Sequence, residues 1–236
     1  MNTSVLSKFD LFTAKVVERD SRVTVLASSN RKGEFRAHLR NTGRLEDLIF
    51  PGATVVCEWK EDGKTDARVI GAVDNGSYVL LDTYVQEEAF GKLLDRTGLE
   101  SLPRIIEVKS QVSVETSRFD FGIKTESGMG YLELKSAVSC DKGWASYPDA
   151  PSGRGLEHIR LLGRLAREGV PVYVIFIVTH PNCEGFRPNG KIQPEMVSEL
   201  NSAKKAGVKI FAVKMVLTEK GEVFLTDRNL PVSLVP

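Results

Sequence analysis

The longest apolar run in the chain, residues 170–178, constrains the fold more than any other feature. It is too short to span a bilayer, and its length and composition predict a buried strand. Helical patterns flank it over residues 155–168 and 192–206, the second ending at Gly207. Earlier segments predict a helix over 83–94 and strands over 105–114, 118–124 and 131–138; a last strand is predicted over 209–217. This order predicts a mixed sheet with helices on its faces.

The first third of the chain has a different pattern. Short strand candidates lie at residues 12–17, 22–28, 34–39 and 53–59, with turn residues between them. Such a meander predicts a small barrel or sandwich. We therefore place a domain boundary near residues 75–80.

Charge and cysteine content limit the partners and the cellular compartment that we expect for the protein. Lys and Arg number 32 and Asp and Glu 31, so a nucleic-acid partner would have to be bound by local clusters of charge. Three cysteines, Cys57, Cys140 and Cys183, show no zinc-site spacing, which predicts free thiols in a reducing cytosol. No signal peptide is recognisable at residues 1–12, and no segment predicts a membrane span, so we expect a cytoplasmic protein.

Three charged side chains on two neighbouring strands form the strongest candidate site. Residues 117–121 alternate polar and apolar, so Phe119 and Phe121 should share one face and Asp120 the other. Residues 131–135 alternate in the same way, which places Glu133 and Lys135 on one face. A loop at 126–127 sets Asp120 opposite Glu133, and a loop at 127–128 sets it opposite Lys135. Either register brings the three side chains together.

This clustering predicts a metal site. Two carboxylates about 5 Å apart repel by roughly 3 kcal/mol at an effective dielectric of about 20, which a divalent cation would offset. Mg²⁺, or Mn²⁺ in its place, prefers such oxygens, and the pair with Lys135 fits metal-assisted phosphodiester hydrolysis. The alternative is a trio of ion-paired side chains on an exposed sheet face.

Two groups of basic residues are candidates for nucleic-acid contact. In the β-rich third, a cluster comprises Arg31, Lys32, Arg36, Arg40 and Arg44. On the helix over 155–168, Arg160, Arg164 and Arg167 form one stripe. His158 aligns with the apolar face of that helix and should point inward, either as a buried histidine or as a site residue that contacts nucleic acid. Arg154, in the loop before that helix, could reach a phosphate or cap the helix. Solvated basic surfaces are the alternative for both groups. The His180-Pro181-Asn182-Cys183 segment lacks partner ligands and predicts a loop.

Several sequence blocks resemble a known family. They are Asn41-Thr42-Gly43, Arg118-Phe119-Asp120-Phe121, Glu133-Leu134-Lys135, Tyr147-Pro148-Asp149-Ala150 and Arg154-Gly155-Leu156-Glu157-His158. Together they resemble the sugar fermentation stimulation protein A family over nearly the whole chain. Val23, where an aromatic residue is usual, and residues 60–73 depart from the family pattern.

The resemblance implies a mixed α/β fold with two domains. Residues 1–78 would form an OB-like β-barrel, and residues 79–236 a mixed-sheet α/β/α domain similar to PD-(D/E)-x-K nucleases and restriction endonucleases. It implies that Asp120, Glu133 and Lys135 are catalytic, that Glu88 assists Asp120 and Glu133 in binding the metal, and that Asn41 contacts a ligand. DNA, or RNA, would be the partner; the oligomeric state stays open, a homodimer included.

Two functions follow from these expectations. The first is a Mg²⁺-dependent nuclease, and the second is a DNA-binding regulatory protein that affects sugar metabolism without cutting nucleic acid. Clustered carboxylates favour the first, because a protein that only binds phosphates does not need groups that repel them. Nothing in the residues themselves indicates an enzyme of sugar metabolism.

Overall fold

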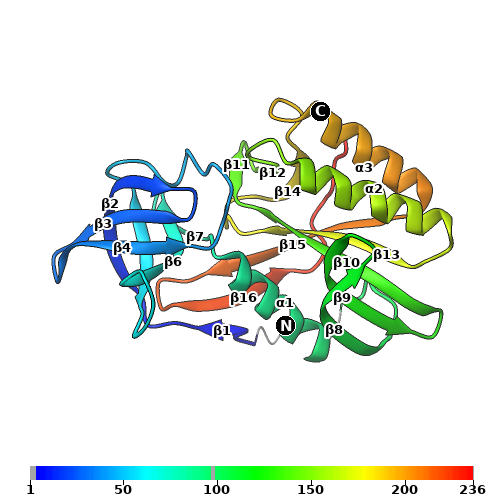
Figure 1. The fold of residues 1–236 in the computed structure, drawn as a ribbon, viewed down its shortest axis with the longest axis horizontal. Helices are drawn as coiled ribbons and strands as arrows, with labels where there is room; N and C mark the ends of the chain where they lie inside the picture. Colours follow the sequence, from blue (N-terminus) through cyan, green and yellow to red (C-terminus); the bar gives the residue numbers. More distant parts are fainter. Residues whose placement is uncertain (1–3, 97–98, 236) are drawn as a thin grey trace.

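Strands of the N-terminal third curl into a closed barrel, the blue and cyan lobe of Figure 1. The computed structural model describes residues 4–96 and 99–235. Six strands lie in the order β4-β3-β2-β5-β6-β7, and an additional pairing of β4 with β6 closes a five-stranded ring. These strands are β2 (Phe12–Ser21), β3 (Thr24–Ser29), β4 (Gly33–Leu39), β5 (Thr54–Trp59), β6 (Ala67–Asp74) and β7 (Ser77–Leu80).

The larger lobe is built on a seven-stranded mixed sheet in the order β1-β16-β15-β13-β10-β9-β8. Its strands are β1 (Ser7–Lys8), β8 (Ile105–Val114), β9 (Ser117–Thr125), β10 (Gly128–Ala137), β13 (Val172–Val178), β15 (Lys209–Leu217) and β16 (Glu222–Asp227). The central strands β10, β13 and β15 are parallel, and the outer pairings are antiparallel. Every residue of β13 is buried, as expected for a strand covered on both faces.

Helices cover both faces of this sheet, as Figure 1 shows. Helix α1 (Thr83–Arg96) packs on one face through Val85, Phe90 and neighbouring residues, and α2 (Gly153–Arg167) and α3 (Pro194–Ala206) pack together on the other. Helix α2 starts at Ser152, whose Oγ accepts a hydrogen bond from the Gly155 backbone N–H at 3.0 Å. The apolar side chains accordingly divide into separate cores on the two sides of the sheet.

The predicted mixed α/β architecture is confirmed. Each predicted helix or strand is also present near its predicted place. Strands β1, β6, β7 and β16 were not predicted, nor was a small sheet of β11 (Ser139–Asp141), β12 (Trp144–Tyr147) and β14 (Gly185–Pro188). Strand β7 spans the predicted boundary between residues 78 and 79, while β1 belongs to the larger sheet. The expected absence of a signal peptide concerns residues 1–12, of which 1–3 lie outside the described residues. None of the described helices combines the length and apolar composition that a bilayer span requires.

Candidate functional site

Strands β9 and β10 bring the predicted trio together. Their pairing runs from Gly128 opposite Thr125 to Leu132 opposite Phe121, which is the register with the loop at 126–127. One step further along, Asp120 meets β10 beside Glu133, and its Oδ2 accepts a hydrogen bond from the Leu134 backbone N–H at 2.7 Å.

One detail of the predicted alternation is wrong. Phe119 and Phe121 do not share a face, because Phe119 packs in the core beneath α2 and Phe121 packs in the core beneath α1. The neighbouring strand β8 is irregular at this level: Gln111, which falls opposite Asp120, has a left-handed backbone with φ 55°. Asp120 therefore lies where the regular pleat of the sheet is interrupted.

Glu133 is the centre of a buried cluster. Its Oε1 accepts hydrogen bonds from the Lys135 ammonium and from His158 Nδ1, the latter at 2.6 Å. Because an ionised carboxylate can only accept, His158 Nδ1 carries the proton, and its Nε2 is free to accept from Arg154 Nε at 3.5 Å. The predicted inward direction of His158 is confirmed, since its side chain is only 5% exposed.

The remaining oxygen of Glu133 distinguishes this cluster from an ordinary salt bridge. Oε2 is buried and has no hydrogen-bond partner among the described residues. An unpaired buried carboxylate oxygen is costly, and a bound cation is a partner that would offset this cost. The chemistry of this oxygen, with the Asp120 carboxyl beside it, fits a hard divalent cation.

The electrostatics of the trio are set by burial and mutual charge. Burial, reinforced by the charge of Glu133, raises the pKa of Asp120 to about 7. Burial also acts to raise the pKa of Glu133, but Lys135 and His158 outweigh it and hold that pKa below its ordinary value. For Lys135, burial acts to lower the pKa, yet the Glu133 charge prevails and raises it. Lys135 is thus a stable cation, while Asp120 changes charge near neutral pH.

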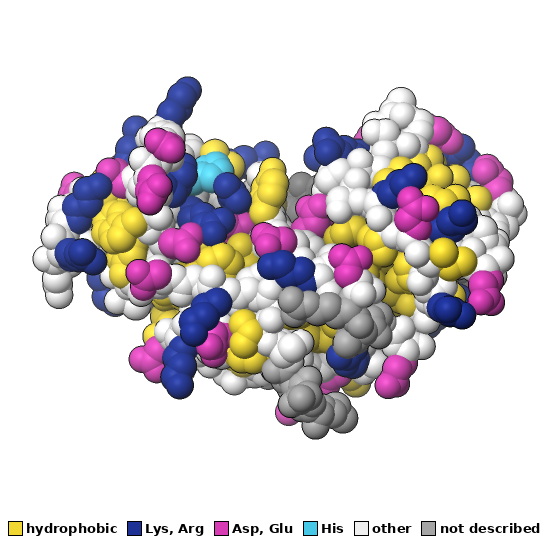
Figure 2. Space-filling model, turned by 90° about the horizontal axis from the view of Figure 1, so that it is seen from below, with side chains coloured by type: hydrophobic (Ala, Val, Ile, Leu, Met, Phe, Trp, Pro, Cys, Tyr) yellow, Lys and Arg dark blue, Asp and Glu magenta, His cyan; other side chains and the backbone are white. Residues whose placement is uncertain are grey.

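Two cavities give access to the trio from different sides. One of about 480 Å³ lies between the barrel and residues 147–152 and reaches Lys135. The other, of about 790 Å³, lies against α1 and reaches Asp120. Arg40, Thr83 and Tyr84 border both cavities. The space-filling view in Figure 2 shows an indentation between the barrel lobe on the left and the larger lobe on the right.

Glu88 borders the same cavity as Asp120 but is more exposed than the three residues of the trio. It borders the cavity of Asp120, is 64% exposed and pairs with Lys92 at 2.7 Å. Among the described residues, the carboxylate oxygens of Asp120, Glu133 and Glu88 do not form a set lying entirely within 4.8 Å. The part of Glu88 in metal binding stays a prediction.

The predicted nucleic-acid contacts separate into two groups. Arg40 and Arg154 border the cavities of the trio, where Arg118 and Arg22 join them. The others lie outside those cavities: Arg36 pairs with Asp20, Arg160 pairs with Glu199 at 2.8 Å, Arg164 forms two hydrogen bonds with Glu115 at 2.6 and 2.8 Å, and Arg44 is exposed beside Arg19 and Arg22. The structure thus places the basic residues nearest the trio on both lobes.

Asn41 has a structural role that the sequence did not reveal. Its Nδ2 donates to the Leu81 carbonyl at 3.1 Å, and its Oδ1 accepts from the Gly43 backbone N–H at 2.9 Å. A Cβ on Gly43 would lie 2.2 Å from Oδ2 of Asp149, which itself accepts from the Leu45 backbone N–H at 3.2 Å. Two of the recognised blocks, one from each lobe, therefore pack on each other beside the smaller cavity.

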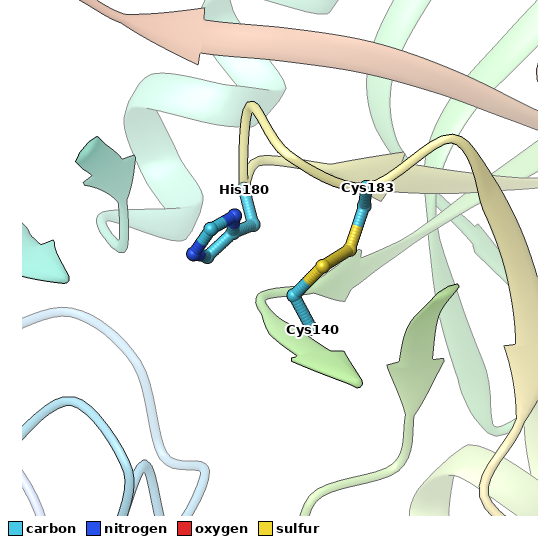
Figure 3. A group of neighbouring side chains, drawn as sticks. All are labelled: Cys140, His180 and Cys183. Carbon is cyan, nitrogen blue, oxygen red and sulfur yellow. A yellow bond between two sulfur atoms is a disulfide. The ribbon is translucent and has the colours of Figure 1, made fainter. Parts of the chain in front are cut away.

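Figure 3 shows a second cluster, in which Cys140 and Cys183 are joined by a disulfide next to His180. The three side chains offer metal-ligand atoms within 4.8 Å of one another. The sulfurs, however, are bonded to each other, and both nitrogens of His180 have partners: Nε2 lies 3.1 Å from Oδ2 of Asp74 in the barrel, and Nδ1 accepts from the Asn182 backbone N–H. The arrangement cross-links β11 and the loop after β13, and the histidine ties that loop to the barrel.

The prediction of free thiols is therefore wrong for two cysteines. Strands β10 and β13 are parallel neighbours, so the segments that follow them emerge at one edge of the sheet and bring Cys140 to Cys183. No local spacing pattern reveals a contact between residues 43 positions apart. Cys57 is free and buried, and burial raises the pKa of its thiol to about 12.

Comparison with known proteins identifies the family. The model of the SfsA N-terminal OB domain matches residues 12–81, and that of the sugar fermentation stimulation protein RE domain matches residues 84–221. The chain belongs to the sugar fermentation stimulation protein A (SfsA) family. The predicted resemblance is thereby confirmed, and the OB-like nature of the barrel with it.

Two SfsA relatives match over more than nine-tenths of their own length. The homologue of Pyrococcus furiosus is 35% identical over 213 residues, covering 90% of this chain and 92% of the relative. The homologue of Archaeoglobus fulgidus is 32% identical over 219 residues, covering 92% and 94%. A solved structure described as Pyrococcus furiosus SfsA in complex with Ca²⁺ superimposes with a TM-score of 0.91 at 34% identity, covering 98% of this chain and 99% of that one.

Proposed function

We propose that this protein is a divalent-metal-dependent nuclease that acts on DNA or RNA. The observation that carries the proposal is the buried, unpartnered Oε2 of Glu133 in the cluster with Lys135, next to Asp120. Carboxylates that repel each other and a phosphate have no use in a protein that only binds nucleic acid. With a metal they form a hydrolytic site.

Asp120 and Glu133 would hold the cation, which we propose to be Mg²⁺ or Mn²⁺. The Ca²⁺ in the described complex of Pyrococcus furiosus SfsA supports a cation site in this fold, because Ca²⁺ also prefers oxygen ligands. When bound, such an ion stabilises negative charge on a phosphate and lowers the pKa of water. Glu133 is held in place by His158 and Lys135, so its free oxygen is fixed before the ion arrives.

Lys135 would supply a fixed positive charge. Glu133 raises its pKa, so the ammonium keeps its proton at neutral pH and is not suited to take one from water. It borders the smaller cavity, where it can orient a water molecule and neutralise a phosphate oxygen. We therefore assign Lys135 to positioning and charge stabilisation in preference to general-base catalysis.

The nucleic acid would occupy the two cavities and the surface between the lobes. Arg22 and Arg40 approach from the barrel side, and Arg118 and Arg154 from the larger lobe. Phosphate contacts of this kind give affinity without sequence preference and make it dependent on salt. We propose that these residues, rather than the outer face of α2, provide the main phosphate contacts.

Single-turnover digestion tests this function. End-labelled single- and double-stranded DNA and RNA are incubated with Mg²⁺, Mn²⁺ or chelator. Lys135→Ala should reduce cleavage by roughly a hundredfold, the scale of losing a positioned group, while Lys205→Ala, an exposed control on α3, should not. Glu133→Gln should abolish both cleavage and the response to metal.

Folding must be monitored, because both changed residues are buried. Circular dichroism at the assay temperature separates loss of fold from loss of chemistry. Wild type that cleaves no substrate with any metal, yet binds nucleic acid, would overturn the nuclease and favour the regulatory DNA-binding protein. Cleavage at the wild-type rate by Lys135→Ala would remove that residue from the mechanism.

A further inference from the structure

Tyr84 is an exposed aromatic residue beside the proposed active site. Its side chain is 63% exposed at the start of α1, more than that of any other large hydrophobic aromatic among the described residues, with Phe50 at 49% next. The guanidinium carbon of Arg40 lies 5.0 Å from the centre of the Tyr84 ring. Whereas Arg36, Arg160 and Arg164 each pair directly with a carboxylate, the Arg40 guanidinium lies over this ring and acts on the Asp82 carboxylate only through longer-range charge.

The backbone around this pair is held firmly. The Arg40 carbonyl accepts hydrogen bonds from the Thr83 hydroxyl at 2.8 Å and from the Thr83 backbone N–H at 3.1 Å. Asp82 caps the helix by accepting from the Tyr84 backbone N–H at 2.9 Å. Arg40 follows strand β4 of the barrel and Tyr84 lies in the first turn of α1 in the larger lobe, so these bonds fix the two backbone segments relative to each other across the junction.

The position of the Arg40–Tyr84 pair suits contact with a nucleic-acid strand. Arg40 and Tyr84 border both the cavity that reaches Lys135 and the one that reaches Asp120. A nucleic-acid strand that occupied both cavities would run past this pair. An exposed aromatic ring with an arginine on it offers stacking to a base and charge to the adjoining phosphate.

We propose that Tyr84 and Arg40 form a stacking site for an unpaired base of a single-stranded nucleic acid. The inference rests on the proposed function and specifies its substrate class. A base inside a duplex is covered on both faces by its neighbours and cannot present one to Tyr84. A single strand, or an unpaired end, can do so at little cost, and every base has a face to offer.

Binding measured in chelator isolates this site from cleavage. Fluorescence anisotropy would compare labelled oligothymidylate with an abasic strand that has the same phosphates, with a blunt duplex, and with oligouridylate as the RNA arm. Wild type should bind the base-bearing strand tighter than the abasic strand and the duplex. Tyr84→Ala should weaken binding of the base-bearing strand about tenfold and leave the abasic strand unchanged.

Matched variants separate stacking from bulk or fold. Tyr84→Phe keeps the ring and should bind like wild type, whereas Tyr84→Leu keeps an apolar side chain and should behave like Tyr84→Ala. Phe50→Ala removes the other exposed ring and should change nothing. Because Tyr84 is exposed, its variants should melt with the wild type, which the same samples can verify.

The outcomes distinguish this inference from the proposed function. Equal affinity of Tyr84→Ala and wild type, or equal binding of duplex and single strand, would overturn the stacking site even if the wild type cleaves. Loss of base-dependent binding in Tyr84→Ala, in a wild type that cleaves nothing, would support the stacking site and overturn only the nuclease. A wild type that binds none of the strands would overturn the stacking site, while the nuclease would still be decided by the cleavage assay with metal. Preference between the DNA and RNA strands identifies which of the two single strands the site accepts.

Discussion

At the scale of single residues, the site depends on how one carboxylate is shared. Glu133 gives one oxygen to Lys135 and His158 and keeps the other free. For His158 the sequence left a buried position and a nucleic-acid contact open; the residue is buried, and its Nδ1 holds Glu133 in place. Asp120 has no such cationic partner in direct contact among the described residues, and its raised pKa makes its charge respond to pH near neutrality.

The raised pKa of Asp120 predicts a pH-dependent stability. Between its ordinary value of 3.8 and about 7, this carboxyl stays protonated in the folded protein but ionises in the unfolded chain. The folded state then binds more protons, so stability should fall as pH rises through this window, by about 4 kcal/mol for this group at about 1.4 kcal/mol per pH unit. Denaturant unfolding of metal-free protein at pH 4 to 8 should show the fall, and Asp120→Asn should lack that share of it. The same slope in both proteins would contradict the assigned pKa.

Metal binding predicts a second effect at the same residue. Mg²⁺ or Mn²⁺ should raise the melting temperature at pH 8, because a ligand that binds only the folded state stabilises it, by about 2.7 kcal/mol at a hundred times Kd. Asp120→Ala should abolish this rise. Glu88→Ala should reduce it only in part, since Glu88 is exposed and paired with Lys92. An equal rise in wild type and Asp120→Ala would exclude Asp120 as a ligand.

The residues of the trio were within reach of sequence analysis, but their surroundings were not. Strand alternation and one short turn were enough to bring Asp120, Glu133 and Lys135 together, with two registers left open. The contact of His158 with Glu133 depends on how α2 packs on the sheet, and Tyr84 matched no motif. Contacts between elements distant in sequence leave no local pattern for a single chain to show.

At the scale of elements, helix α2 presents different chemistry on its two sides. Arg154 and His158, four positions apart, face the cluster of Glu133, in keeping with helical spacing. Arg160 and Arg164 are exposed, and Glu199 and Glu115 pair with them. The arginine stripe was a candidate for nucleic-acid contact, with a solvated helix face as the alternative. Because carboxylates already pair with Arg160 and Arg164, we propose the inward end of the helix for that contact.

Paired arginine variants test this division. Replacing Arg118 and Arg154 by Ala should weaken binding of single-stranded DNA about tenfold and lower the salt slope by about 1.4, because two phosphate contacts are lost. Replacing Arg160 and Arg164 serves as the matched control with the same change of charge, and should have a smaller effect. Affinities measured over a range of salt concentrations decide the point. A larger loss in the control pair would return the binding surface to the outer face of α2.

Helices and strands were predicted correctly where the sequence pattern is strong. They were missed where a strand forms only because a distant segment of the chain pairs with it. The apolar run of β13 and the capped helices were evident in the sequence. Strand β6 contains Gly71, whose Cβ position lies 2.4 Å from the Val79 carbonyl, so this glycine marks a close strand approach rather than a turn. Strands β1 and β16 pair with each other at the edge of the sheet although they come from opposite ends of the chain.

At the scale of the whole molecule, the two lobes are not independent bodies joined by a linker. Val56, Ile70 and Leu80 of the barrel share a core with Met215 and Leu217 of the larger sheet. The Gly43 turn packs on Asp149, and His180 reaches Asp74 of the barrel. A boundary drawn from sequence patterns marks where the pattern changes, but the two parts are held together by a shared core.

The disulfide contributes to this cohesion and predicts a redox-dependent stability. Cross-linking Cys140 to Cys183, 43 positions apart, removes loop entropy from the unfolded chain equivalent to about 4 kcal/mol in the chain-entropy treatment. Reduction should therefore lower the free energy of unfolding by up to this amount, measured by denaturant titration with and without dithiothreitol. The double variant Cys140→Ser, Cys183→Ser should have the same lowered stability with and without dithiothreitol. It is also the control, because a reductant effect that persists in it would have to come from elsewhere in the protein.

Cys57 is buried as a free thiol and has no bond to lose, so dithiothreitol should leave it unchanged. If wild type and double variant unfold at the same denaturant concentration without reductant, the cross-link does not stabilise the fold, and the contact between β11 and the loop after β13 rests on packing alone.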